Sequence, residues 1–139
     1  MKDNLILRIT AKLLIPFIIL FALYVQFHGD FGPGGGFQAG VIFSSAFILY
    51  TLVYGLETAE RIIPVHILKI FASLGVLIYA GTGVAGLLLG AQFLNYSVLA
   101  EVPITGQHLG IIVIELGVGI TVAAVMIMIF FSFAGRGRQ

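Results

Sequence analysis

The chain has 139 residues, of which 60% are hydrophobic and only 9% are charged, and its mean hydropathy is +1.13. This composition excludes an ordinary soluble globular domain. The formal net charge of +1 supplies no basic patch for nucleic acid, and the lack of cysteine excludes disulfides and thiolate metal sites.

Four long apolar runs dominate the sequence, at about residues 8–27, 34–54, 65–90 and 108–133. At about 1.5 Å of rise per residue, a helix over each run can cross a hydrocarbon core about 30 Å thick. The runs therefore predict an all-α integral membrane protein. We expect four transmembrane helices with short loops, which form a single domain over residues 1–139.

The first run carries Arg8 and Lys12 near its start, and we expect these side chains to reach the lipid headgroups. The run ends in a polar, glycine-dense stretch. Gly29 is suited to end the first helix in the left-handed conformation, and Pro33 to occupy the first position of the next. The stretch predicts a tight helical hairpin in which glycines allow another backbone to approach closely. Its hairpin and packing residues are Gly32, Pro33, Gly34, Gly35, Gly36 and Gly40.

Polar side chains are few in the second run, and glycines are frequent in the third. We expect Gln38, Ser44 and Ser45 to form hydrogen bonds between helices. Five glycines lie between positions 75 and 90. They predict that the third helix is the packing centre of the four.

The fourth run contains Glu115, the only acidic residue inside any of the apolar runs. A carboxylate near the middle of a membrane helix costs about 2.5–3.5 kcal/mol on insertion scales, and somewhat less towards the outer side, where we expect Glu115 to lie. Either a cation or hydrogen-bond donor pairs with Glu115, or its side chain stays protonated. His108 lies seven residues earlier, on the same helix face and about 10 Å away. Glu115 and His108 are therefore the candidates for an ion route.

The basic residues predict the orientation of the chain. With four spans, every lysine and arginine falls on the side that holds both termini, whereas Asp30 and Glu101 are the full charges of the two opposite loops. By the positive-inside rule both termini are cytoplasmic. The basic residues are Lys2, Arg8, Lys12, Arg61, Lys69, Arg136 and Arg138.

Motifs of soluble enzymes give no support for catalysis. Residues 34–39 satisfy G-x-G-x-x-A, but a dinucleotide fingerprint follows a β-strand, and here a membrane helix precedes it. The sequence has no phosphate-binding loop, no nucleophile elbow and no carboxylate–histidine cluster with metal spacing. We therefore predict no catalytic, cofactor-binding or metal-binding residues.

Three strings carry a resemblance to a known family: HGDFGPGGGFQAG at 28–40, GQHLG at 106–110 and ELGVGITV at 115–122. The chain resembles the B subunit of Mrp-type multisubunit cation/proton antiporters over nearly its whole length. The resemblance implies a hetero-oligomeric complex in a prokaryotic cell membrane that exchanges cytoplasmic Na+ for external H+. It also implies a secondary-transporter subunit, not an enzyme, whose large partner subunits resemble proton-translocating ones.

Other readings remain open at this point. The chain could be a structural subunit of a related complex I-like or hydrogenase-like membrane assembly, with Glu115 pairing to a neighbour. It could also form a small channel by self-assembly through its glycine stripes. The preference among Na+, K+ and Li+ is not encoded in any recognisable motif.

Overall fold

The computed structural model describes residues 5–29 and 32–136, and these residues form helices and connecting segments without a β-strand. The long helices are α1 (Leu5–His28), α2 (Gly36–Tyr54), α4 (Val65–Leu88) and α5 (Pro103–Gly135). All four are long and apolar enough to cross a membrane. The predicted all-α fold with four membrane-spanning helices is confirmed. Two short elements, α3 (Leu56–Ile62) and the 3-10 helix η1 (Tyr96–Leu99), lie in the connections.

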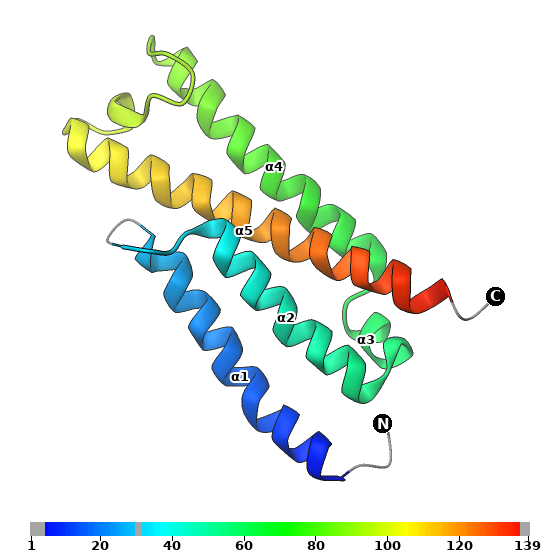
Figure 1. Cartoon of the computed structure of the whole chain (residues 1–139). Coiled ribbons are helices and arrows are strands. Elements are labelled where there is room, and N and C mark those ends of the chain that lie inside the picture. Colours follow the sequence, from blue (N-terminus) through cyan, green and yellow to red (C-terminus); the bar gives the residue numbers. More distant parts are fainter. Residues whose placement is uncertain (1–4, 30–31, 137–139) are drawn as a thin grey trace.

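The four long helices are arranged as a row in the order α1, α2, α5, α4 (Figure 1). Helix α5 packs extensively against α2 on one side and α4 on the other, while α1 packs mainly on α2. The prediction that the third run is the packing centre was wrong. Only 17% of the apolar window of α4 is buried, against 28% in α5 and 39% in α2. Glycines alone could not identify the centre, because Gly81 in α4 faces open space.

Two glycines set the contact between α4 and α5. A Cβ atom on Gly75 would lie 2.5 Å from the carbonyl oxygen of Gly117, and one on Gly117 would lie 2.8 Å from that of Gly75. The hydroxyl of Thr121 donates to its own helix at Gly117 (2.9 Å) and reaches the carbonyl of Ala72 on α4 (3.4 Å). Small residues thus let the two backbones approach closely, which is the usual basis of helix association in membranes.

The connection between α1 and α2 differs in detail from the predicted hairpin. Helix α2 begins at Gly36, three residues after Pro33, so Pro33 is not its first residue. The left-handed backbone occurs at Gly35 (φ 122°) and not at Gly29. The Gly35 N–H donates to the carbonyl of Val25 (3.1 Å), which ties the end of the hairpin back to α1.

The last helix begins at Pro103, five residues before the predicted start. Proline suits the first turn of a helix because its missing N–H would have no partner there. Before it, the ring of Tyr96 packs over Gly110, where no side chain could fit. Burial of the phenol, with a smaller contribution from nearby Tyr79, raises the pKa of Tyr96 above its usual value.

Polar side chains of α2 bond within their own helix. Ser44 and Ser45 donate to the carbonyls of Val41 and Ile42, both at 2.7 Å. The expectation of hydrogen bonds between helices was therefore wrong for these serines, and Gln38 is exposed. Serine in a helix can always reach a carbonyl one turn back, which removes the need for a partner on another helix.

The end of the bundle that holds α3 contains an apolar core. Helix α3 packs against α2 and α5, and Ala59 is completely buried there. The core residues are Leu56, Ala59, Leu68, Ala124, Ile127 and Phe131.

The described basic residues are Arg8, Lys12, Arg61, Lys69 and Arg136, and they belong to the same end of the bundle as α3 (Figure 1). The Arg8 guanidinium lies over the ring of Tyr54, 5.4 Å from its centroid. Lys2, Asp30 and Arg138 lie outside the described residues. The cytoplasmic placement of this end stays a prediction.

Substitution of Gly75 by alanine is expected to destabilise the bundle, because its Cβ would meet backbone atoms of α5. Overpacking of this kind costs about 1–3 kcal/mol. Gly81 on the same helix is the matched control: a Cβ there meets nothing within 4 Å. Thermal unfolding in mild detergent, followed by circular dichroism, should show a lower midpoint for Gly75→Ala and an unchanged or higher one for Gly81→Ala. Equal midpoints would contradict the observed α4–α5 contact.

The orientation can be measured with single cysteines, because the chain has none of its own. Glu101 and Arg136 are both exposed and lie at opposite ends of the bundle. In intact cells an impermeant maleimide should label Glu101→Cys and leave Arg136→Cys unlabelled until the cells are opened. Labelling of Arg136→Cys in intact cells would reverse the predicted orientation.

Candidate functional site

Glu115 lies on α5 where this helix passes the connection between α1 and α2. Its side chain is half-buried. A Cβ atom on Gly29 would lie 2.6 and 2.7 Å from its two carboxylate oxygens, and one on Gly35 would lie 3.0 Å from the nearer oxygen. The carboxylate therefore rests directly on the glycine hairpin, the segment 29–36, of which residues 30 and 31 are outside the described part.

Glycine is required here because the hairpin and α5 touch through their backbones. A Cβ on Gly36 would overlap the carbonyl group of Glu115. One turn further along α2, a Cβ on Gly40 would lie 2.7 Å from the carbonyl oxygen of Gly119. Gly34 lies against α1 instead, with the Val25 carbonyl oxygen 2.8 Å from its Cβ position. Three helices thus meet around Glu115.

The other predicted hairpin residues contribute less to this meeting point. Gly32 faces the imidazole of His28, whose Nε2 lies 3.1 Å from the Gly32 Cβ position. Pro33 is exposed in the bend before α2. Gln38 places its side-chain oxygen 3.5 Å from the Gly35 Cβ position, near the carboxylate of Glu115.

His108 is exposed, two helical turns before Glu115 on the same helix. Both residues take part in interactions within the protein. Because α5 is continuous between them, the rise of the helix separates the two residues by about 10 Å. The glycine hairpin lies beside Glu115, and His108 lies nearer the start of α5.

Sequence reasoning missed Gln26, which belongs to the same junction. Its side-chain oxygen lies 2.5 Å from the position that a Cβ on Gly119 would take, one turn beyond Glu115 on α5. The carbonyl oxygen of Gly36 is 3.3 Å from that position. Gln26 is the only amide side chain in the first apolar run, and that rarity was the available signal.

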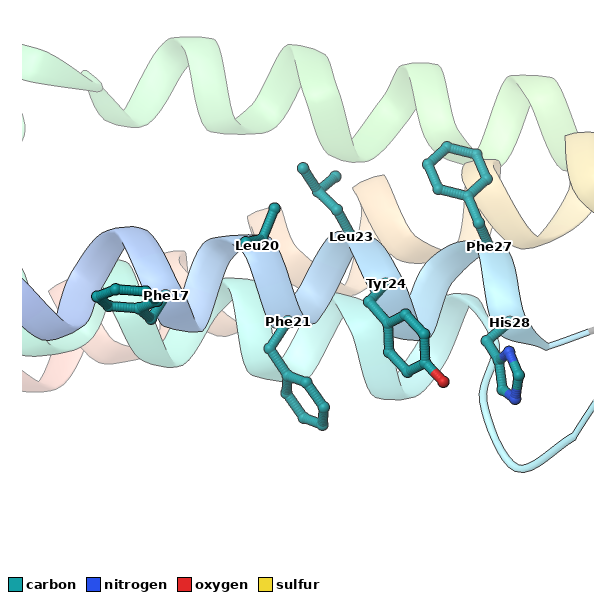
Figure 2. A pocket seen from close by; sticks show the side chains of 7 residues that line it. All are labelled: Phe17, Leu20, Phe21, Leu23, Tyr24, Phe27 and His28. Carbon is teal, nitrogen blue, oxygen red and sulfur yellow. The ribbon is translucent and has the colours of Figure 1, made fainter.

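Helix α1 carries an aromatic face on the side opposite to Gln26. Phe17, Phe21, Tyr24 and His28 share one face of the helix, and the Tyr24 and His28 rings stack at 5.0 Å (Figure 2). A hollow of about 580 Å³ is lined by this helix alone, so it is an open surface without converging polar groups. Such a face suits contact with lipid or protein better than binding of a small polar molecule.

The junction around Glu115 has limited but definite chemistry. A carboxylate with nearby amide and carbonyl oxygens can exchange a proton or contact a monovalent cation. Among the described residues, no group of three or more His, Asp or Glu side chains could hold a metal ion.

These features define a multi-pass membrane protein whose one intramembrane acid is held at a helical hairpin. The chain belongs to the family described as a domain related to the MnhB subunit of Na+/H+ antiporter, whose model matches residues 6–128. Relatives in Staphylococcus aureus strains Newman, JH1 and Mu3 are named as a candidate antiporter subunit, mnhB2. Each is 38% identical over 122 residues, which cover 85% of this chain and 86% of the relative. The resemblance inferred from the three sequence strings is confirmed.

The contact between Glu115 and Gly29 can be tested by a double-mutant cycle. Gly29→Ala should destabilise the wild-type chain and cost less in a Glu115→Ala background, where the carboxylate is gone, with a coupling of about 0.5–3 kcal/mol. Gly36→Ala is the control, because its Cβ meets backbone atoms of Glu115 that remain in Glu115→Ala. Unfolding midpoints in detergent supply the measurement. Additive effects of Gly29→Ala and Glu115→Ala would place the carboxylate elsewhere.

Proposed function

We propose that this chain is a membrane subunit of a multisubunit sodium/proton antiporter and that Glu115 lies on the ion route of the complex. Membership in the MnhB-related family and the four apolar helices support the first part. We place the protein in the prokaryotic cell membrane with both termini in the cytoplasm, on the basis of the basic residues gathered at one end of the bundle.

The contact of the Glu115 carboxylate with the glycine hairpin is the observation that carries the second part. An acidic residue inside a membrane helix is usually functional, because the free-energy cost of its insertion is otherwise selected against. Here the backbone of the hairpin that joins α1 and α2 lies against the carboxylate, and Gly29 and Gly35 leave no side chain between them. A half-buried position allows protons or cations to reach the side chain while keeping it partly out of water.

His108 and the hairpin take supporting roles in this proposal. His108 is exposed two turns before Glu115 on the same helix, and we propose that it lies on the approach to the carboxylate. The glycines at 34, 35, 36 and 40 hold α1, α2 and α5 close enough to shape the site. Na+ and H+ are the transported ions of the proposed complex, and the chain itself acts together with unlike subunits.

A purely structural role for Glu115 has one specific observation in its favour. Both carboxylate oxygens lie against Gly29, so the side chain can hold the hairpin on α5 whether or not it ever binds an ion. In that case the chain serves the assembly of the complex, and ion movement takes place in other subunits. The two roles predict different behaviour of variants that change charge without changing shape.

Substitution of Glu115 in the complete antiporter should separate these roles. Glu115→Gln keeps the shape and removes the titrating group, so we expect antiport to fall by an order of magnitude or more, about 1.4 kcal/mol, with normal assembly. Glu115→Asp should retain part of the activity with a shifted pH profile. Sodium-dependent collapse of a pH gradient in inverted membrane vesicles measures antiport, and co-purification of the unlike subunits measures assembly.

Glu101→Gln is a matched control, because Glu101 is the exposed acid of the loop before α5 and should not affect antiport. Wild-type rate and unchanged pH dependence in Glu115→Gln would exclude the ion-route role. If Glu115→Ala then fails to assemble while Glu115→Gln assembles and works, the carboxylate is structural.

A further inference from the structure

A groove of about 440 Å³ runs between α1 and α4, which do not pack against each other, and is floored by α2 and α5. We call it the α1–α4 groove. Leu23 and Phe27 form its α1 wall, and both point towards the side on which α4 lies (Figure 2). Leu68 and Phe71 belong to its α4 wall.

The floor of the α1–α4 groove combines small residues with the larger Phe43, Leu116, Ile120 and Ile127, and the groove is deepest over the small ones. Ala39 and Gly40 come from α2, and Gly119, Ala123 and Ala124 come from α5. A helix lying in the groove could therefore bring its backbone close to both. The groove extends from Gln26 at the hairpin end to Ile63 and Ile127 at the end that holds α3. On α5 the lining residues lie between positions 116 and 127, so the groove follows part of the helix Pro103–Gly135.

We propose that the α1–α4 groove receives a transmembrane helix of an unlike subunit and that Gln26 is the polar contact that fixes its position. The proposal rests on the function proposed above, in which the chain works inside a hetero-oligomer. Only 11% of the apolar window of α1 and 17% of that of α4 are buried within the chain, so both walls have surface left for a partner.

Gln26 indicates the chemistry of the partner. Its amide lies in a groove whose other lining residues are apolar, and an amide among apolar side chains gains from a hydrogen-bonding partner. An acyl chain fills apolar space but offers no donor or acceptor. A partner helix with small residues along one face could pack on the floor of the groove. One hydrogen-bonding side chain on that helix, near the level of Gln26, could bond to the amide.

A second copy of this chain matches the α1–α4 groove less well. A symmetric dimer would put the same face of each copy together, and two concave faces leave the space between them unfilled. The partner helix would lie against Gly119 and Gln26, one helical turn from Glu115. Docking in the groove therefore brings the unlike subunit next to the proposed ion site.

Photo-cross-linking in the complete complex tests the proposal. Benzoylphenylalanine replaces Phe43, which lines the groove and is 37% exposed, in a conservative change that should preserve folding. The same reagent at Phe17, on the other face of α1, reports the background. We expect illumination to join position 43 to an unlike subunit, identified by mass spectrometry.

Two further variants make the result specific. Ala123→Trp fills the groove and should abolish the adduct, whereas Ala80→Trp, at an exposed site on α4 outside the groove, should keep it. Gln26→Leu should lower the yield.

An adduct with lipid alone, or with a second copy of the chain, would overturn the groove proposal. If unlike subunits still co-purified, the proposed function would stand. An unchanged adduct in Ala123→Trp would also overturn it. A chain that purifies without unlike subunits would overturn both the groove proposal and the proposed function.

Discussion

The close approach of three backbones at the glycine hairpin is the constraint on which the rest of the structure depends. Gly36 and Gly40 lie against α5 with no room for a side chain, and Gly34 lies against α1. Without a hydrophobic driving force between helices in lipid, such contacts supply much of the association energy. They also fix where Glu115 lies, because the same turn of α5 that touches Gly36 carries the acid.

Much of this architecture could be predicted from the sequence, because hydropathy, glycine and proline act locally. Run length gives the four helices, and a lone acid in an apolar run is conspicuous without any coordinates. Helix order in the row was not predictable, since it depends on which of many small-residue faces match. The glycines of α4 illustrate this: Gly75 touches α5, but nothing lies within 4 Å of a Cβ on Gly81.

The candidate site was predictable only in part for the same reason. Glu115 could be identified from the sequence because a carboxylate in an apolar run has a high free energy of membrane insertion. Its neighbours could not, because they come from segments about 80 to 90 residues away along the chain. Gln26 illustrates the limit, because its role depends on the missing side chain of Gly119 on another helix. It links the hairpin to the α1–α4 groove, so the ion site and the proposed docking surface share one residue.

Helix α5 is longer than a bilayer requires. This length bears on how much of the membrane an ion could cross along this chain alone. Its 33 residues extend about 50 Å, against a hydrocarbon core of about 30 Å. In the proposed orientation Gly135 is at the cytoplasmic end of α5, and Glu115, 20 residues away, lies about 30 Å from it, towards the outer side of the membrane. An ion at Glu115 would have entered from the outer water with little of the membrane crossed. The remaining depth would have to be crossed along surfaces that this chain shares with its partners.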